Sequence, residues 1–413
     1  MFADFEDLVL LNQAQLRIHG RPYWRAQFRE DPIKARFTLL LGPRGVGKTT
    51  AMVQILLDTA GGDPLRPEIL YVPSDHIGLK GWSLYEIGKT FALRGGKQIC
   101  FDEIHKVEGW SQELKSLYDS FPELIILASG SSAIEISKGG QDLSRRAQVR
   151  YLHGLSFREF LELRYGLELP SLTLPQILET HDRCAETVLE RLKPTGRRIL
   201  ALFYEYLRSG YFPFFLENAE ESLYLNLLEQ NVHAVLESDI LAVNPSFTGA
   251  TVRKMERLVS VVAASVPFKP DFRALKNLLE IGDERTLKQY LHLMEKAGLL
   301  LSLTVSGKGL KTMEKPEKIY LGNTNLVHAL SRGRAEPGNV RETFFLSLVG
   351  TRHAVTAPAS GDFLVDGQWT FEVGGKGKGV AQIAGVANAF LALDDIECGS
   401  GRKIPLWLFG CLY

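Results

Sequence analysis

A glycine-rich loop between a strand and a helix constrains this chain more than any other feature. The segment FTLLLGPRGVGKTT holds the pattern G-x-x-x-x-G-K-T directly after a short apolar run and before a helical stretch expected at residues 50–59. Glycines let the backbone curl so that successive N–H groups face one anion, and the following helix adds its positive end. The pattern therefore predicts a phosphate-binding loop. We assign nucleotide contacts to Gly42, Pro43, Arg44, Gly45, Val46, Gly47, Lys48, Thr49 and Thr50.

Two further groups of residues fit the chemistry of a nucleoside triphosphate. Lys48 is expected to reach the β- and γ-phosphates, and Thr49 to offer its hydroxyl to Mg²⁺. Asp102 and Glu103 follow the apolar run QICF, where a carboxylate is costly unless a cation or donors compensate it. We expect Asp102 to hold Mg²⁺ through water and Glu103 to act as the general base. The alternative is an acid pair that caps the next helix.

Hydroxyl groups follow the fourth apolar run, and guanidinium groups precede the fifth. In LIILASGSS, Ser131 is expected to position the attacking water, with Ser129 as second choice; a helix N-cap is the alternative. Arg145 and Arg146 precede the fifth run. An arginine there can reach the γ-phosphate bound by a neighbouring copy, which implies self-association. The alternative is a solvated or ion-paired basic pair.

Short apolar runs alternate with helical patterns over the first part of the chain. Continuous apolar runs are typical of parallel strands buried on both faces, so we predict an α/β fold, a P-loop NTPase domain with a five-stranded parallel sheet. The expected strands are Phe37–Leu41, Glu68–Val72, Gln98–Phe101, Leu124–Ala128 and Val149–Leu152.

Composition limits the remaining classes of protein. A chain of 413 residues is long enough for several domains. Lysine plus arginine and aspartate plus glutamate number 48 each, so contact with nucleic acid would need a local basic patch. The four cysteines form no CxxC pair, which favours a reducing compartment. The longest apolar run is about half of a membrane span, and we expect a cytoplasmic protein that does not contact the membrane.

Five segments resemble a known family. GPRGVGKTT, CFDEIHKVEGWSQELKSLYD, ILASGSSAIEIS, DLSRRA and LHGLSFREFL are similar to bacterial and archaeal AAA+-superfamily ATPases that carry a winged helix and a C-terminal restriction-endonuclease-like domain of unknown function. The resemblance implies ATP as the nucleotide, a sheet order 5-1-4-3-2 and a helical lid near Ile177–Leu241. It also implies Walker A at Gly42–Thr49, Walker B at Asp102 and Glu103, and an arginine finger at Arg145 or Arg146. SGYFP resembles the family's GG[FY]P element, but Ser209 replaces one glycine and we assign it no chemistry.

The pattern and the resemblance together predict four segments. Residues 1–165 are expected to form the P-loop ATPase core and residues 166–262 a helical lid or linker region. Residues 263–334 are expected to form a winged-helix domain. Residues 335–413 are expected to form a restriction-endonuclease-like α+β module, with its site degenerate.

The winged-helix segment carries a candidate nucleic-acid surface. DFRALKNLLEIGDERTLKQYLHLMEKAGLLLSL has the pattern helix, turn, helix, strand. Its second helix places polar side chains on one face, and a lysine-containing hairpin follows. Such side chains reach phosphates and base edges, which favours double-stranded DNA as a partner. The alternatives are a protein-docking module and a solvated helix face. The residues concerned are Arg285, Lys288, Gln289, His292, Lys308 and Lys311.

The C-terminal segment places acids as a metal-dependent nuclease does, but incompletely. Glu342 lies on an expected helix, and Asp362 and Glu372 lie on adjacent expected strands. The lysine that a nuclease needs two residues after the glutamate is Gly374, and Lys376 comes two residues late. Gln382 follows on an expected helix.

Three functions remain open from the sequence. The first is a DNA-associated ATPase that moves its winged helix. The second is an ATP-dependent signalling switch or scaffold with slow turnover. The third is an ATP-gated nuclease, which the incomplete acid–lysine pattern disfavours.

Overall fold

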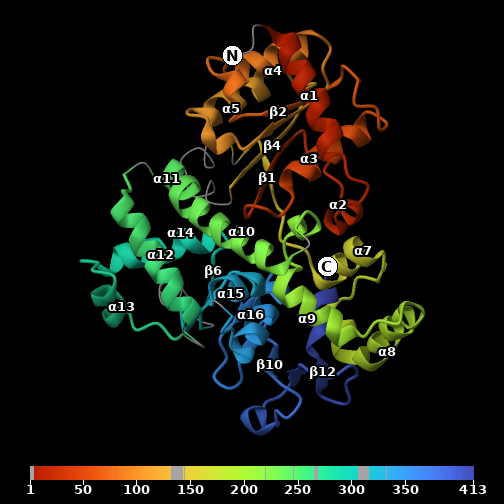
Figure 1. Ribbon diagram of the computed structural model, residues 1–413, viewed down its shortest axis with the longest axis vertical. Helices are drawn as coiled ribbons and strands as arrows, with labels where there is room; N and C mark the ends of the chain where they lie inside the picture. Colours follow the sequence, from red (N-terminus) through yellow and green to blue (C-terminus); the bar gives the residue numbers. More distant parts are fainter. Residues whose placement is uncertain are drawn as a thin grey trace. The chain divides into compact units, whose positions relative to one another are not determined.

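The computed structural model describes residues 4–131, 143, 145–218, 220–244, 246–264, 268–305, 316–331 and 333–413. The chain divides into two compact units (Figure 1). The first comprises Met1–His153 together with Glu237–Phe247, and the second comprises Gly154–Leu236 together with Thr248–Tyr413. The segment Glu237–Phe247 therefore belongs to the first unit, whereas the residues before and after it belong to the second.

The first unit is built on the parallel sheet that the sequence predicts. Its strands run in the order β2-β3-β4-β1-β5, which is the expected order 5-1-4-3-2 read from the other edge. All pairings are parallel. The α/β P-loop fold class is thereby confirmed. The strands are β1 (Phe37–Gly42), β2 (Ile69–Pro73), β3 (Gln98–Asp102), β4 (Ile125–Ser131) and β5 (Gln148–Tyr151).

The register of this sheet gathers the polar strand ends at one edge. Strand β1 is buried along its whole length, as a central strand with two covered faces must be. Gly42 at its end pairs with Ser131, and Pro73 at the end of β2 pairs with Asp102. Ligands of open α/β sheets bind at the carboxyl ends of the strands. The predicted phosphate loop and the predicted acids therefore share one edge.

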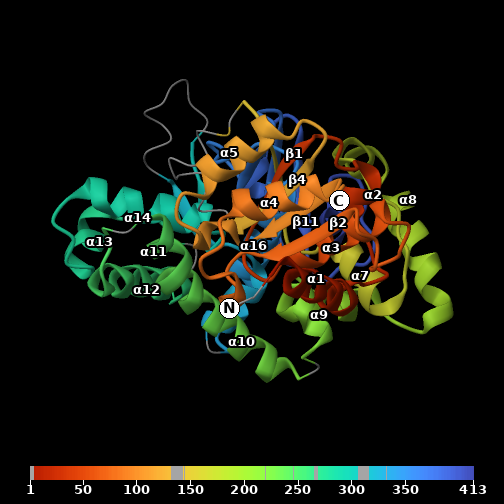
Figure 2. The ribbon, with the colours of Figure 1, turned by 90° about the horizontal axis from the view of Figure 1, so that it is seen from above.

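Helices cover both faces of the sheet (Figures 1 and 2). Helices α1 (Phe5–His19) and α3 (Lys48–Thr59) lie on one face, and α4 (Leu84–Leu93) and α5 (Trp110–Ser120) on the other. Helix α3 connects β1 to β2, in one direction across the sheet, whereas α4 and α5 connect β2 to β3 and β3 to β4, in the opposite direction. Since crossovers between parallel strands are right-handed, helices that connect strands in opposite directions lie on opposite faces.

Short elements complete the first unit. They are α2 (Ala26–Glu30), the 3₁₀ turns η1 (Ile77–Leu79) and η2 (Ile104–Lys106), the end of the π-helical turn η6 (Val235–Asp239) and helix α11 (Ile240–Val243).

The second unit begins with the helical stretch that the sequence predicts. Short connections at residues 196–198 and 210–212 separate its first helical elements. Aromatic side chains form much of the core, for example Phe203 and Phe344, whose ring centroids are 4.8 Å apart in a T-shaped contact. The elements are α7 (Phe157–Tyr165), α8 (Leu174–Leu192), η4 (Lys193–Thr195), α9 (Ile199–Ser209), η5 (Pro213–Leu216), α10 (Glu221–Ala234) and α12 (Gly249–Ala264).

The conspicuous GLSFREFL segment has a structural explanation in this unit. Ser156 caps α7, and its partner in the capping box is Glu159. The Ser156 hydroxyl also donates to the carbonyl of Tyr413 at 2.6 Å, and Arg158 donates to the same carbonyl at 3.1 Å. The segment therefore holds the last residue of the sequence against α7.

Two helices and a two-stranded sheet follow α12. Helix α13 (Phe272–Leu278) precedes α14 (Glu284–Lys296), whose N-cap is Asp283. Strands β6 (Leu300–Leu303) and β7 (Lys318–Leu321) pair in antiparallel fashion. Residues 306–315 between them, which include Lys308 and Lys311, lie outside the described residues.

The C-terminal part combines two helices with a mixed sheet. Helix α15 (Thr324–Leu330) leads to α16 (Pro337–Val349), and the sheet runs in the order β12-β11-β10-β9-β8. Strands β8, β9 and β10 pair antiparallel, whereas β10, β11 and β12 pair parallel. The elements are β8 (Val355–Thr356), β9 (Phe363–Val365), β10 (Trp369–Gly374), η8 (Ala381–Ile383), β11 (Ala389–Leu393), β12 (Lys403–Pro405) and η9 (Leu406–Cys411).

Across the described ranges, no helix has the length and apolar character needed to cross a membrane.

Candidate functional site

The loop after β1 has the conformation that its glycines allow. Gly45 and Gly47 have φ values of 86° and 94°, in the left-handed region that favours glycine. At Gly42 a Cβ atom would lie 2.3 Å from the carbonyl oxygen of Leu152, so only glycine fits there. The Lys48 ammonium donates to the carbonyls of Gly42 and Pro43, at 3.0 and 3.1 Å. The loop is thus curled around the lysine that we expect to contact phosphate.

Asp102, at the end of β3, is the centre of the site. Its Oδ2 accepts hydrogen bonds from the hydroxyls of Thr49 and Tyr71, each at 2.6 Å. Its Oδ1 accepts from the Ser129 hydroxyl and, at 3.1 Å, from the backbone N–H of Glu103. The Asp102 side chain is buried, so these donors compensate the loss of water and fix the carboxylate.

Glu103 has an unusual backbone conformation next to this carboxylate. Its φ of 55° and ψ of 41° place it in the left-handed region, which costs a residue with a Cβ about 1 to 2 kcal/mol. Such strain is found mainly at functional sites. The Glu103 N–H also contacts the Ser129 hydroxyl at 3.1 Å, which helps to hold the turn. Its carboxylate is about one-third exposed, and its Oε2 lies 3.5 Å from His105 Nε2.

The two serines proposed for the attacking water differ in their surroundings. Ser129 pairs with Leu40, and its hydroxyl contacts Asp102 rather than standing free for a water. The backbone of Ser131 pairs with Gly42 at the start of the phosphate loop. Its side chain lies outside what the structure describes. Ser131 therefore remains a prediction that rests on its position at the strand end.

The two arginines proposed as a finger also differ. Arg146 Nε and NH2 each lie 2.9 Å from the Asp119 carboxylate, in a two-pronged ion pair. This pair raises the pKa of Arg146 and lowers that of Asp119. Arg146 thus forms a structural ion pair, which was the alternative to its role as an arginine finger. Arg145 is exposed, so of the two it is the better candidate to reach another copy.

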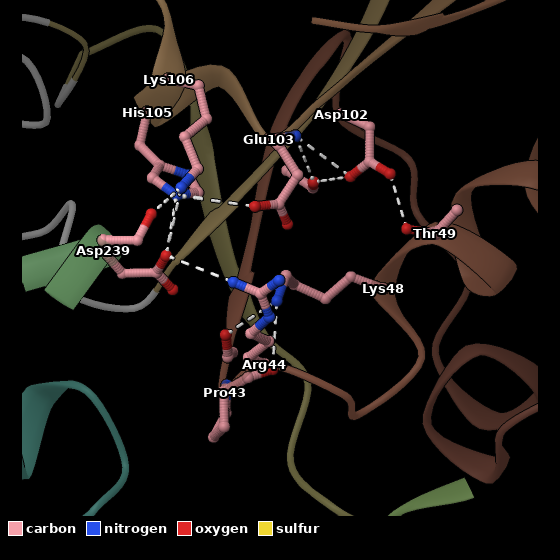
Figure 3. A network of polar contacts seen from close by, with 12 residues as sticks. Pro43, Arg44, Lys48, Thr49, Asp102, Glu103, His105, Lys106 and Asp239 are labelled. Atoms are coloured by element: carbon pink, nitrogen blue, oxygen red, sulfur yellow. Dashed lines mark hydrogen bonds and ion pairs between the residues drawn. The ribbon is translucent and has the colours of Figure 1, made fainter. Parts of the chain in front are cut away.

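A second network surrounds Asp239, which comes from the segment Glu237–Phe247 (Figure 3). Asp239 Oδ1 lies 3.4 Å from Lys106 Nζ, 3.6 Å from His105 Nε2 and 3.8 Å from Arg44 NH1. Lys106 Nζ also contacts the hydroxyl of Ser238. The sequence analysis placed this segment in a lid or linker region and gave it no site residue. The structure instead brings Asp239 beside the phosphate loop and the turn that holds Glu103.

Burial and charge shift the pKa values of three of these groups. Burial lowers the pKa of Lys48, against the opposing effect of Glu103, Asp102 and Asp239. Burial raises the pKa of Glu103, and Lys48 and His105 only partly oppose that shift. Burial alone would raise the pKa of Asp239, but the nearby His105, Lys106 and Arg44 outweigh it and the pKa is lowered.

The residues proposed for Mg²⁺ fit that ion by their chemistry. Mg²⁺ prefers oxygen ligands from one or two carboxylates or hydroxyls, together with water and substrate phosphates. The Thr49 hydroxyl and the Asp102 carboxylate supply such oxygens, side by side and next to the phosphate loop. Within the described ranges, no group of three or more histidine, cysteine, aspartate or glutamate side chains could hold a metal ion by itself.

The exposed face of α14 is present as expected. Arg285, Gln289 and His292 are exposed, whereas Lys288 Nζ contacts Glu284 Oε1 at 3.2 Å. Lys318, the first residue of β7 after the predicted hairpin, is paired with the acids Glu342 and Asp362. Contact of this face with DNA remains a prediction.

The C-terminal acids form two ion-paired clusters. Lys318 Nζ lies 3.0 Å from Glu342 Oε2 and 3.2 Å from Asp362 Oδ1, and Tyr320 donates to Glu342 Oε2 at 2.6 Å. Burial would lower the pKa of Lys318, but the two carboxylates outweigh it and the pKa is raised. A lysine ammonium thus lies between two of the acids that were proposed for the degenerate nuclease site.

Glu372 is paired with a lysine that the sequence analysis did not select. Lys378 Nζ lies 2.5 Å from Glu372 Oε1, whereas Lys376 is exposed. The chain leaves the strand after Gly374, so counting residues along a strand face does not apply there. Burial raises the pKa of Glu372, against the effect of Lys378. Gln382 is exposed and lies in the three-residue 3₁₀ turn η8 rather than on a long helix.

Two residues of the site, Tyr71 and Asp239, were not predicted from the sequence. Tyr71 carried a usable signal, because a tyrosine in a buried strand needs a partner for its hydroxyl. Asp239 carried none, because its partners are distant in the chain.

Comparisons with known proteins match two parts of the chain to family models. Residues 34–161 match the AAA domain family AAA_14, and residues 200–336 match a domain of unknown function, DUF8612. The chain is 29% identical over 299 residues to uncharacterized protein MJ1637 of Methanocaldococcus jannaschii. That match covers 69% of this chain and 60% of the relative, so the chain spans less than two-thirds of the relative's length.

Solved structures give only distant likenesses. Domain III of the Thermotoga maritima replication initiation protein DnaA matches 49% of this chain and 95% of its own, at 18% identity and a TM-score of 0.24. PCH-2 of C. elegans matches 70% of this chain and 68% of its own, at 12% identity and a TM-score of 0.25. Likenesses at this level carry no argument about function. Residues 34–161 thus match an AAA-domain model and have the strand order and phosphate loop of an α/β P-loop NTPase fold.

Proposed function

We propose that this chain binds ATP with Mg²⁺ and hydrolyses it. The observation that carries the proposal is the junction of two distant segments, where the Thr49 hydroxyl meets the Asp102 carboxylate at 2.6 Å beside the curled loop. P-loop NTPases hold Mg²⁺ next to the phosphates with such a hydroxyl and such a carboxylate. A bound Mg²⁺ would neutralise developing negative charge on the phosphate oxygens.

The residues of the site then have distinct roles. The Lys48 ammonium, which donates to two carbonyls of the loop, would donate to β- and γ-phosphate oxygens instead. The backbone of Gly42–Thr50 would bind the remaining phosphate oxygens. Thr49 and Asp102 would hold the metal ion. Glu103 would accept a proton from the attacking water, and the raised pKa of its carboxyl suits a base close to neutral pH. Ser131 is proposed to position the attacking water, and Arg145 is proposed to reach the γ-phosphate bound by a neighbouring copy.

A turnover assay tests the proposal. Wild-type protein should release phosphate from ATP in the presence of Mg²⁺ and lose that activity with excess chelator. Lys48→Ala should lose most of it, whereas Lys89→Ala, on α4 and outside the site, should keep it. Hydrolysis that persists in Lys48→Ala at the wild-type rate would show that the activity does not come from this loop.

We further propose that ATP turnover is coupled to a DNA-binding surface on α14. The exposed side chains Arg285, Gln289 and His292 on one face of a 13-residue helix support this proposal, together with the helix–helix–hairpin order of residues 272–321. Stimulation of ATP turnover by duplex DNA, lost in an Arg285→Ala/Gln289→Ala variant, would support it. Turnover that duplex DNA leaves unchanged would favour the signalling switch or scaffold.

The ion-paired acids argue against the nuclease alternative. Glu342 and Asp362 share the Lys318 ammonium, and Glu372 is paired with Lys378. We propose that this part of the chain is a restriction-endonuclease-like module whose acids serve structure. The division into core, lid, winged helix and C-terminal module remains a proposal, with Glu237–Phe247 added to the core.

A further inference from the structure

One acidic residue from outside the matched residues 34–161 faces the nucleotide site. Asp239 is only 3% exposed and lies at the end of the π-helical turn η6. Short π-helical turns are rare and occur often at functional sites. The segment that carries Asp239 belongs to the first unit, although the chain before Glu237 and after Phe247 belongs to the second. Asp239 is therefore delivered to the site by a separate part of the chain.

Asp239 lies close to both the phosphate loop and the turn that holds Glu103 (Figure 3). Its Oδ1 lies 3.8 Å from NH1 of Arg44, which is part of the phosphate loop. The same oxygen lies 3.6 Å from Nε2 of His105, and that nitrogen lies 3.5 Å from Oε2 of Glu103. A chain of close contacts thus runs from the phosphate loop through Asp239 to the proposed base.

His105 has two carboxylates competing for one nitrogen. An N–H at Nε2 donates a short hydrogen bond to one oxygen at a time, so the imidazole can hold Asp239 or Glu103 closely but not both. The His105 side chain is 1% exposed, and water cannot readily take the place of either acid. When His105 donates to Glu103, the Glu103 carboxylate is occupied. When His105 donates to Asp239, the Glu103 carboxylate is available to a water.

Arg44 lets the phosphate loop influence that competition. A triphosphate brings several negative charges to the loop, and a guanidinium is attracted to phosphate oxygens more strongly than to a single carboxylate some 3.8 Å away. When Arg44 turns to the nucleotide, Asp239 loses one of its three basic neighbours. The Asp239 carboxylate then still interacts with Lys106 and His105. Its stronger interaction with His105 draws the imidazole away from Glu103.

We propose that Asp239 is a positioning residue that responds to nucleotide in the phosphate loop and withdraws His105 from Glu103. The proposal deepens the proposed ATPase function and rests on it for the role of Glu103. It assigns a specific task to the segment Glu237–Phe247, whose two ends continue into the second unit. Since coupling is reciprocal, a shift of this segment would in turn alter nucleotide binding.

Steady-state ATP turnover of the full chain tests the withdrawal of His105. Asp239→Asn should lower kcat about tenfold, with KM within about twofold of wild type, because Glu103 stays engaged by His105. Asp239→Glu keeps the charge and should retain more activity. Adding His105→Phe to Asp239→Asn should recover most of the lost kcat, which a merely structural role of Asp239 would not allow.

Glu237→Gln is the matched control for these variants. Glu237 is an exposed acid of the same turn, so its loss changes the net charge equally but leaves the network intact. It should retain wild-type kcat. If Glu237→Gln and Asp239→Asn lower kcat alike, or if the Asp239→Asn/His105→Phe variant is no faster than Asp239→Asn, the proposal is overturned.

Hydrogen exchange tests the response to nucleotide without requiring hydrolysis. Adding a nonhydrolysable ATP analogue with Mg²⁺ should change amide exchange in Ile240–Val243 of the wild-type protein by about threefold or more. The change should be absent in Asp239→Asn that still binds the analogue. An identical response in both proteins would contradict the role of Asp239. Absence of ATP turnover alongside a wild-type-specific response would instead refute the hydrolytic function and leave Asp239 as a nucleotide-responsive residue.

Discussion

The hydroxyl of Thr49 lies 2.6 Å from a carboxylate oxygen of Asp102, which joins the first turn of α3 to the end of β3. The same oxygen accepts a hydrogen bond from Tyr71 on β2. Three segments of the sheet and its helices are thus fixed at one carboxylate. Removal of any donor should therefore affect both the fold and the site.

Tyr71→Phe tests the structural part of this arrangement. The substitution removes a buried hydroxyl and leaves Asp102 with one donor fewer, so we expect a loss of about 1 to 2 kcal/mol in unfolding free energy. Urea unfolding measures the change. Tyr85→Phe on α4 is the control and should change the unfolding free energy by less than about 0.5 kcal/mol. Equal effects of the two substitutions would show that the Tyr71–Asp102 contact contributes nothing specific.

Lys318→Met tests the ion-paired cluster of the second unit. Removing the ammonium leaves Glu342 and Asp362 largely buried without their cation, and we expect a loss of about 3 kcal/mol in unfolding free energy. Adding Asp362→Asn should recover part of that loss because one unpaired charge is removed. Lys376→Met is the exposed control. If Lys318→Met is as stable as this control, the cluster is not structural.

The pH dependence of unfolding tests a buried histidine. Burial, with Arg208 adding to the effect, lowers the pKa of His328 from 6.5 to about 4. A group with a lower pKa in the folded protein binds its proton first in the unfolded chain. Its contribution to stability therefore falls as the pH drops through 6.5 and levels off below about 4, by up to about 3 kcal/mol in total.

His328→Gln should remove that component from the pH profile of the unfolding free energy. His292→Gln, at an exposed histidine of α14, should leave it in place. A profile that is the same for wild type and His328→Gln between pH 6.5 and 4 would show that His328 is not held in its neutral form.

Local patterns were enough to predict the sheet and the phosphate loop. Five continuous apolar runs became β1 to β5. Most ends of these strands lie one residue from the predicted end, and the end of β4 lies three residues beyond it. Burial on both faces leaves a continuous apolar signal in β1, β2 and β3, whereas β5 is an edge strand whose residues are exposed or half-buried. The loop from Gly42 to Thr49 was predictable because its geometry depends on glycines that lie close together in the sequence. The strand order came from the resemblance and not from the runs themselves.

Contacts between distant segments were not predictable in this way. Asp239 reaches the site from a segment that follows several helices of the other unit, and no local pattern distinguishes it from other acids of a helix. Because side chains alternate along a strand, two serines two residues apart, Ser129 and Ser131, could not be told apart from the sequence pattern. Only the pairing of β4 with its neighbours decides that Ser129 meets Asp102.

Glu103→Gln gives the most direct test of the central claim, that the acids at the end of β3 hydrolyse a nucleotide held in the phosphate loop. The glutamine keeps the size of the side chain and cannot accept the proton. Binding of ATP with Mg²⁺ and a single turnover of the bound nucleotide should be measured on the same protein, with Glu108→Gln, an exposed acid of the next turn, as control. The account predicts near-normal ATP binding and cleavage slowed by about 100-fold or more. Undiminished cleavage by Glu103→Gln would contradict it.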